Sequence, residues 1–422
     1  MASDIDWRSH ILSGCLAERI ANFRNYQNDR SGLRSELYGR RVLSSMDRTV
    51  VVACPFEGTS HEMIMMGSNN YLGLANHPRV KQAVQAAISD YGVGVAGPPL
   101  LNGNSLLHRE LEEKLADMKG HEDACLFASG YQANLGICQA LITSKDQLFF
   151  DEKSHASLYR GLRPLMGGRG PWRPRRFRHN DYADLAACLE SATPPGDVYV
   201  AVEGVYSMQG DAVDLAEIDR LRQIHGFKLI LDDAHGLGVL GQGRGTEHHY
   251  GMWAEVSMGT FSKSMAVTGG YVAGDKDLVE YLRFFAEAAV FSASLPIPTV
   301  AAVLEGLRII EEQPEIVEQL LHNARYMQAG LEQMGYRVVA GDSAILALPI
   351  PAHIDIRALN KELHCSGLFV NAIEPPAVPA ADQMLRLSLS TVHTRKDLNT
   401  ALGIMEKVGR SFQVLREEAC LV

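Results

Sequence analysis

Residues 228–236 read KLILDDAHG, a short apolar run that ends in two acidic residues and a histidine. The run Lys228–Leu231 is typical of a buried strand, so Asp232 and His235 should follow a strand end. In open α/β sheets, ligands bind outside the carboxyl ends of the strands. These polar residues are therefore the first candidates for a functional site.

The same pattern recurs along the middle of the chain. Further predicted strands are Ala124–Ala128, Gln147–Phe150, Val198–Val202, Val256–Met258 and Gly270–Ala273. Between them lie helical patterns over Pro78–Tyr91, Leu106–Met118, Asp181–Leu189 and Leu215–His225. Strands that alternate with helices predict an α/β fold with a largely parallel sheet covered on both faces.

The pattern divides the chain into three parts. Residues 1–60 form a predicted N-terminal arm with helical spacing over Ile5–Phe23, and residues 61–295 form the large domain. A smaller C-terminal α/β domain, residues 296–422, begins at two prolines. It starts with a long helical region, Thr299 to Met334, followed by strand-like runs at Arg337–Val339, Ile345–Pro349, Leu368–Val370 and Met384–Leu389.

Composition limits the class of protein. The 422 residues are 46% hydrophobic and 21% charged, which excludes a disordered chain, a collagen-like repeat and a coiled coil. The net charge of −10 disfavours nucleic acid and anionic lipid as partners. Seven scattered cysteines without a CxxC pair suggest neither a disulfide framework nor a zinc site, but a reducing compartment. We expect no signal peptide, no membrane span and a cytoplasmic location.

Five predicted strands run into polar residues. The groups that follow them are Ser129-Gly130-Tyr131, the loop to His155, Glu203 with Ser207, Asp232 with His235, and Thr260 with Lys263. One such strand end is common in any protein. Five in series predict a polar site at one edge of the sheet.

These motifs resemble the α-oxoamine synthases, which are fold-type-I enzymes dependent on pyridoxal 5′-phosphate (PLP). The matching stretches are SGYQAN (129–134), DEKSHAS (151–157), EGVYSMQGD (203–211), DDAHGLG (232–238) and GTFSKS (259–264). Their order and spacing match as well, from SNNYLGL (68–74) to LRLSLS (385–390). The resemblance implies the large and small domains of that fold, with PLP in the large one.

The resemblance also implies roles for the residues around the cofactor ring. Lys263 would form the Schiff base, and Asp232 would face the pyridine nitrogen, which must stay protonated for the ring to accept electrons. His235 would reach the phenolic oxygen with Ser207 close by. His155 would stack on the open face of the ring.

A second set of residues would bind the phosphate and the substrate. A phosphate requires N–H groups at a helix start and hydroxyls, which Gly130, Tyr131 and Thr260 would supply. Ser292 corresponds to a hydroxyl that the family takes from the neighbouring subunit, which implies a homodimer with a shared active site. Asn69 and Glu203 match polar site positions of the family.

Arg386 lies among apolar neighbours on a predicted strand. An inward arginine requires a carboxylate, either an acidic residue of the chain or a substrate. The resemblance implies that Arg386 holds the carboxylate of the substrate amino acid.

The implied reaction is a decarboxylating Claisen condensation. Serine, glycine or alanine would react with an acyl thioester, carried on coenzyme A or a carrier protein, to give an α-amino ketone, CO₂ and free thiol. Freed Lys263 would be the general base. SNNYLGL with GTFSKS is more similar to the serine palmitoyltransferase branch than to short-acyl branches. The amino acid, acyl length and pathway (sphingolipid, biotin-like or secondary metabolism) stay open.

Three other functions are compatible with parts of the pattern. Transamination or simple decarboxylation would use the same fold. A metal-dependent hydrolase would use His155, Asp232 and His235 as ligands. A non-catalytic subunit of a hetero-oligomer would not require Lys263.

Two further segments are weaker evidence for a function. GVGVAG (92–97) satisfies GxGxxG but follows a helical pattern, which favours a glycine-rich substrate loop over a nicotinamide site. Pro98-Pro99 stands where the family often has Ser-Arg, so contacts of this loop with the thioester cannot be carried over. The basic run Arg173–Arg178 is either a solvated loop entering a strand or a site for phosphates of coenzyme A or a carrier protein.

Overall fold

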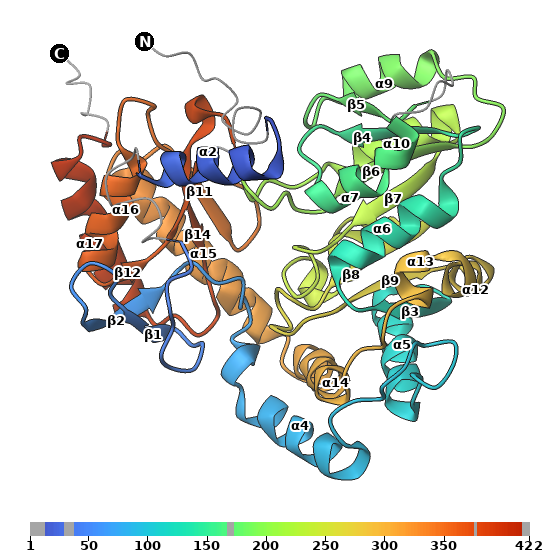
Figure 1. Cartoon of the computed structure of the whole chain (residues 1–422), viewed down its shortest axis with the longest axis horizontal. Helices are drawn as coiled ribbons and strands as arrows, with labels where there is room; N and C mark the ends of the chain where they lie inside the picture. Colours follow the sequence, from blue (N-terminus) through green and yellow to red (C-terminus); the bar gives the residue numbers. More distant parts are fainter. Residues whose placement is uncertain (1–12, 29–37, 167–172, 375–377, 416–422) are drawn as a thin grey trace. The chain divides into compact units, whose positions relative to one another are not determined.

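The computed structural model describes residues 13–28, 38–166, 173–374 and 378–415 (Figure 1). The chain folds into two compact units, each with its own sheets. The larger unit contains residues 69–321 and 341–343, and the smaller unit contains residues 1–68, 322–340 and 344–422. Helix α14 (Ile297–Glu312) belongs to the larger unit, although we predicted the small domain to begin at residue 296.

A seven-stranded sheet forms the centre of the larger unit, in the order β3-β9-β8-β7-β6-β4-β5. The strands are β3 (Asp123–Phe127), β4 (Gln147–Asp151), β5 (Arg175–Phe177), β6 (Val198–Glu203), β7 (Lys228–Asp232), β8 (Val256–Thr260) and β9 (Gly270–Gly274). Only β9 runs antiparallel to its neighbours. The predicted α/β fold with a mainly parallel sheet is confirmed.

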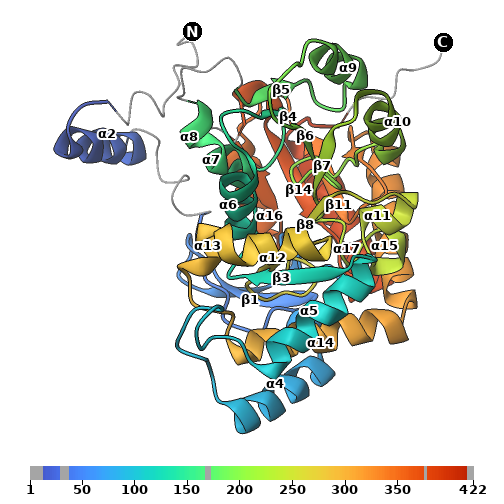
Figure 2. The ribbon, with the colours of Figure 1, turned by 90° about the vertical axis from the view of Figure 1, so that its right-hand side faces the viewer.

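Helices pack on both faces of this sheet (Figures 1 and 2). They are α5 (Leu106–Lys119), α6 (Gly130–Leu141), α7 (Ala156–Gly161), α8 (Arg163–Met166), α9 (Tyr182–Glu190), α10 (Leu215–His225), α11 (Thr246–Tyr250), α12 (Lys276–Phe285) and α13 (Glu287–Val290). Helix α4 (Pro78–Tyr91) packs on α14, and α14 packs on α5. Alternate residues of β7 enter opposite cores: Ile230 packs with α6 and α12, and Leu229 and Leu231 pack with α9 and α10. The period of two along a strand explains why its run is apolar throughout.

The smaller unit contains two more sheets. One has the order β1-β2-β12, and the other β10-β11-β14-β13. Their strands are β1 (Thr49–Ala53), β2 (Ser60–Met65), β10 (Val339–Ala340), β11 (Ile345–Pro349), β12 (Leu368–Phe369), β13 (Asn371–Ile373) and β14 (Met384–Ser388), and the helices of this part are α2 (Leu16–Asn28), α16 (Ile356–Cys365) and α17 (Arg395–Ser411). Strands β1, β2 and β13 were not predicted.

The region predicted as helical from Thr299 to Met334 is two helices. Helix α14 ends at Glu312, and α15 spans Glu315–Gln333. Pro314 lies between them and cannot donate the backbone hydrogen bond that a continuous helix requires. Part of the helix expected over Ile5–Phe23 lies outside the described residues, while α2 starts at Leu16. In the described part of the chain, no helix has the length and apolar character to cross a membrane.

A buried ion-pair network lies beside the end of β7. Lys119 Nζ lies 2.6 Å from Asp233 Oδ2 and 3.1 Å from Glu247 Oε2, and all three side chains are fully buried. Burial alone would raise the pKa of Glu247, but Lys119 and His121 lower it to about 2. The network therefore places two carboxyl groups of the core on one buried lysine.

We expect Lys119→Met to lower the free energy of unfolding by about 3–5 kcal/mol, because it leaves Asp233 and Glu247 buried without their cation. Lys228→Met is the matched control. Its ion pair with Asp197 is half-exposed on both sides, so the loss should be below about 1 kcal/mol. Urea unfolding of both variants measures the difference. Equal losses would show that the Lys119 network contributes no more than a surface pair.

Candidate active site

A cavity of about 180 Å³ lies at the carboxyl ends of β3, β4, β6, β7 and β8. Nine predicted site residues line it: Gly130, Tyr131, His155, Glu203, Ser207, Asp232, His235, Thr260 and Lys263. Ser129, Asn134, Ser157, Ala234, Met258 and Ser262 also line it and were not predicted individually. The residues that follow the predicted strands therefore do meet in one place.

Asp232 is held by a short chain of hydrogen bonds. Asn134 Nδ2 donates to Asp232 Oδ2 at 2.8 Å and lies 2.9 Å from Ser157 Oγ. The Ala234 N–H donates to the second oxygen, Oδ1, at 3.1 Å. Ser157 Oγ in turn lies 2.7 Å from His155 Nδ1, so Asp232 and His155 are positioned by the same two side chains.

Two carboxylates lie side by side on neighbouring strands, because the buried Glu203 and the partly exposed Asp232 are register partners in β6 and β7. Burial raises the pKa of Glu203 well above its ordinary value, and the charge of Asp232 adds to the rise. Burial also raises the pKa of Asp232, although the Asn134 hydrogen bond and His155 oppose it. The backbone N–H groups of His155 and Ser207 donate to Glu203. This part of the cavity favours a cationic group.

His235 belongs to a second hydrogen-bonded chain. Its Nδ1 lies 2.8 Å from the Tyr71 hydroxyl, which also donates to Asn69 Oδ1 at 3.1 Å. Asn69 does not line the cavity and is connected to His235 through Tyr71. Sequence reasoning missed Tyr71, although it lies within the SNNYLGL stretch beside Asn69.

The N-terminus of α6 and two hydroxyls form the opposite end of the cavity. Ser129 caps the helix by accepting from the Gln132 N–H, and Thr260 Oγ1 lies 3.0 Å from Ser262 Oγ. A Cβ at Gly130 would come within 2.8 Å of Thr260 Cβ, so only glycine allows this close approach. A helix start with hydroxyls around it is an anion site, and it fits a phosphate.

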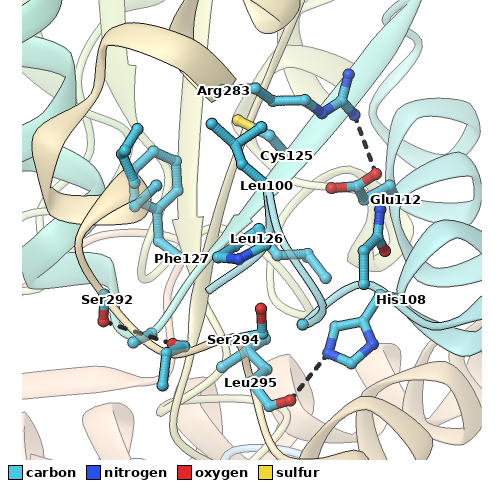
Figure 3. Close-up of a pocket in the computed structure, with 17 residues that line it drawn as sticks. Leu100, His108, Glu112, Cys125, Leu126, Phe127, Arg283, Ser292, Ser294 and Leu295 are labelled. Atoms are coloured by element: carbon cyan, nitrogen blue, oxygen red, sulfur yellow. Dashed lines mark hydrogen bonds and ion pairs between the residues drawn. The ribbon is translucent and has the colours of Figure 1, made fainter. Parts of the chain in front are cut away.

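Besides Asn69, two predicted site residues are not among those that line this cavity. Ser292 lines a separate cavity of about 70 Å³ with Leu100 and Phe127 (Figure 3), and its hydroxyl accepts from Gln132 Nε2 at 3.4 Å. Arg386 is buried in β14 of the smaller unit, where its Nη1 donates to Ser388 Oγ at 2.9 Å. Their roles stay predictions.

Two alternatives from the sequence find no support. Among the described residues, the ligand atoms of His155, Asp232 and His235 do not gather as a metal ion requires. The GVGVAG stretch follows α4 and precedes α5 only after Pro98-Pro99, so it neither ends a strand nor opens a helix.

The basic run is partly a strand. Arg175–Phe177 form β5 at the edge of the sheet, with both arginines exposed, as expected for a solvated segment that enters a strand. Arg178 pairs with Asp181 and Asp184, which neutralise it locally.

His179 connects the two loops that carry His155 and Ser207. Its Nδ1 lies 3.0 Å from Asp151 Oδ1, and its Nε2 lies 2.6 Å from Asp211 Oδ2. Burial alone would lower the pKa of His179, but the hydrogen bonds and charges of the two aspartates raise it to about 9. A protonated His179 therefore joins the end of β4 to the loop after β6.

The pKa shift of His179 predicts a pH-dependent contribution to stability. Because the folded-state pKa is raised, this contribution is fully present below the unfolded-state pKa and is lost as the pH rises through about 9. We expect His179→Gln to cost on the order of 1–3 kcal/mol near pH 6 and much less near pH 10. Melting temperatures at several pH values measure this, with the exposed His249→Gln as control. A difference in melting temperature that does not shrink at high pH would show that the charge of His179 does not hold Asp151 and Asp211 together.

Known proteins are similar to this chain over most of its length. The model of the family "Aminotransferase class I and II" matches residues 61–404. A serine palmitoyltransferase of Bacteriovorax stolpii is 39% identical over 357 residues, 84% of each chain. An 8-amino-7-oxononanoate synthase of Thermoanaerobacter pseudethanolicus is 35% identical over 358 residues, 84% of this chain and 89% of that one.

A solved serine palmitoyltransferase structure with PLP has a TM-score of 0.85 and 32% identity, covering 94% of this chain and 99% of that chain. The chain therefore belongs to the class I and II aminotransferase family and, within it, to the α-oxoamine synthases, which are PLP-dependent enzymes with acyltransferase activity.

Proposed function

We propose that this chain catalyses the decarboxylating condensation of serine, glycine or alanine with an acyl thioester, giving an α-amino ketone, CO₂ and free thiol. The observation that carries the proposal is the single cavity in which Lys263, the Glu203–Asp232 pair and the N-terminus of α6 meet. The similarity to serine palmitoyltransferase and 8-amino-7-oxononanoate synthase supports this reaction over transamination.

The residues present fit PLP. The start of α6 and the hydroxyls of Thr260 and Ser262 would hold the phosphate, and Lys263 would hold the cofactor through its amine. Asn134 Oδ1 is buried with no hydrogen-bond partner among the described residues, as expected where a bound group completes the site. When bound, PLP supplies an electron sink for the negative charge that develops at the substrate α-carbon.

Each remaining residue would then orient a group or move a proton. Asp232 would accept a hydrogen bond from a protonated ring nitrogen, which offsets the desolvation cost of its own charge. His155, fixed at its backbone by Glu203 and at Nδ1 by Ser157, would cover the ring. His235, supported by Tyr71, would bind the phenolic oxygen with Ser207 nearby. Lys263 Nζ would remove the α-proton of the substrate.

Residues that do not line the cavity would bind the substrates and form the dimer. Arg386 would hold the substrate carboxylate in a bidentate pair. Ser292 would contribute its hydroxyl to the phosphate site of a partner subunit, so that the active unit is a homodimer. Arg173 and Arg175 would receive phosphates of coenzyme A or a carrier protein.

The reaction is tested by thiol release from an acyl thioester. We expect the purified holoenzyme to release thiol and CO₂ in equal amounts only when serine, glycine or alanine is present. Lys263→Ala should lose this activity by more than about 1,000-fold, because it removes the base and the cofactor linkage. Lys153→Ala, a lysine of the loop before His155 that lies outside the cavity, is the control and should stay active.

The outcomes separate the alternatives. Amino-group transfer to a keto acid without thiol release would indicate transamination, and CO₂ without thiol would indicate simple decarboxylation. A protein that binds no PLP and shows no visible absorbance would contradict both the role of Lys263 and the reaction proposed here.

Arg386→Lys should raise the KM for the amino acid by about 10–100-fold, because an ammonium cannot replace the bidentate pair. The KM for the thioester should change little. Steady-state kinetics with each substrate varied in turn measure both constants. An unchanged KM for the amino acid would assign Arg386 to the support of β14 instead.

A further inference from the structure

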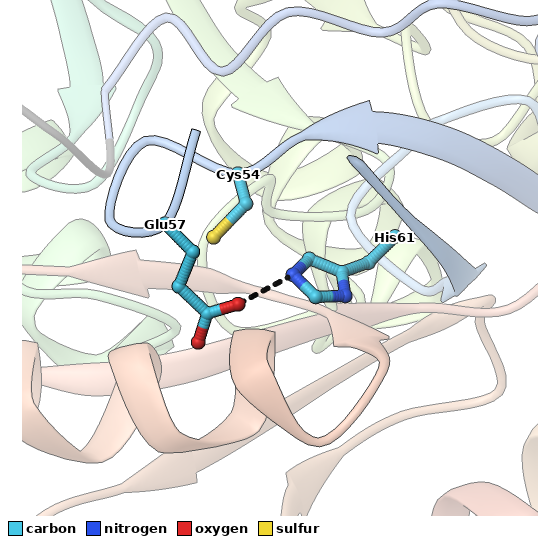
Figure 4. A group of neighbouring side chains, drawn as sticks. All are labelled: Cys54, Glu57 and His61. Carbon is cyan, nitrogen blue, oxygen red and sulfur yellow. Dashed lines mark ion pairs between the residues drawn. The ribbon is translucent and has the colours of Figure 1, made fainter. Parts of the chain in front are cut away.

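Three potential metal ligands gather on the hairpin of β1 and β2, in the smaller unit (Figure 4). Cys54 follows β1, Glu57 lies in the connecting loop, and His61 is the second residue of β2. One ligand atom from each residue lies within 4.8 Å of the others. The loop is closed by a hydrogen bond from the Cys54 N–H to the Thr59 carbonyl at 2.8 Å, which fixes its two ends.

The three side chains differ in exposure. Cys54 is only 4% exposed, whereas Glu57 is exposed and His61 is half-buried. His61 Nε2 lies 3.3 Å from Glu57 Oε2, which an ordinary surface ion pair would also explain. A surface ion pair alone does not explain why the sulfur of the buried Cys54 lies within 4.8 Å of both partners. The thiol supplies a soft ligand, while the carboxylate and the imidazole can be reached from solvent.

A second histidine approaches the same loop from a distant part of the sequence. Strand β12 pairs in parallel with β2, which brings the end of α16 beside the hairpin. The ring of His364 lies 6.3 Å from that of His61 and 5.9 Å from that of Phe56. His364 is fully buried, and its Nε2 has no hydrogen-bond partner among the described residues. His364 Nδ1 lies 3.3 Å from Arg40 Nη1, which can only donate, so Nε2 carries the ring proton and His364 borders the loop without offering it a ligand atom.

We propose that Cys54, Glu57 and His61 bind a divalent transition-metal ion of the zinc class, with water as the fourth ligand. Thiolate and imidazole ligands select zinc over magnesium or calcium. Zinc binds sulfur at about 2.3 Å and nitrogen or oxygen at about 2.0–2.2 Å, so tetrahedral ligands lie about 3.5 Å apart. The three ligand atoms lie within 4.8 Å of one another, so the side chains would have to move closer together to bind the ion.

Binding needs no oxidant and involves one proton. The Cys54 thiol gives up its proton to solvent and the thiolate binds the ion, while Glu57 exchanges its contact with His61 for a contact with the metal. The site includes no residue of the candidate active site. Its effect would be structural, because the ion would join the residue that follows β1 to the start of β2 across the loop.

Zinc binding to the holoenzyme tests the proposal. Equilibrium dialysis against Zn²⁺, followed by metal analysis, should give about one tightly bound ion per chain. Cys54→Ser and His61→Gln should each weaken binding by more than about 100-fold, since the loss of even an outer partner of a metal ligand costs about 10–100-fold. Cys15→Ser, which removes an exposed cysteine elsewhere, is the matched control and should bind as the wild type does.

A second measurement guards against misfolding, since Cys54 is buried and its replacement can lower stability by itself. His61 is half-buried, so His61→Gln should melt like the wild type without metal. Zn²⁺ should raise the Tm of the wild type and of Cys15→Ser but not of His61→Gln, and Mg²⁺ should raise none of them. No binding by the wild type, or equal binding by His61→Gln, would overturn the proposal.

Discussion

The pairing of Glu203 with Asp232 is the constraint around which the site is built. Register places two acids side by side at the ends of β6 and β7, where burial disfavours the charge on both. Backbone N–H groups and the Asn134 side chain donate hydrogen bonds to the two carboxylates and offset part of this cost. Two acids side by side in a partly buried site favour a cationic ligand there.

The last residue of β7, Asp232, and the residue after it, Asp233, belong to different surroundings. Asp232 lines the cavity, while the next residue, Asp233, points to Lys119 and accepts from Thr246. Alternation along an extended chain sends the two acids in different directions. One carboxylate therefore stabilises the fold as part of an ion pair, and its neighbour stays available for chemistry. The motif DDAHG requires both acids for this reason.

Much of the larger unit could be predicted because its strands are short apolar runs buried on both faces, so their bounds are clear in the sequence. The strand ends then led to nine residues of the cavity. Strands β1, β2 and β13 were missed because they are short and partly exposed, and the pairing of β2 with β12 joins residues some 300 positions apart. Tyr71, Asn134 and Ser157 are defined as site residues only by tertiary hydrogen bonds, which no local pattern encodes.

The hydrogen bonds also explain why His155 requires its particular loop. Glu203 accepts the N–H groups of both His155 and Ser207, so one carboxylate sets the positions of two loops that begin on neighbouring strands. His179 joins the same two loops from the opposite side through Asp151 and Asp211. A loop held at two points keeps its side chain oriented without help from the ligand. The cavity is therefore preorganised, and binding a flat charged ring there should cost little loop ordering.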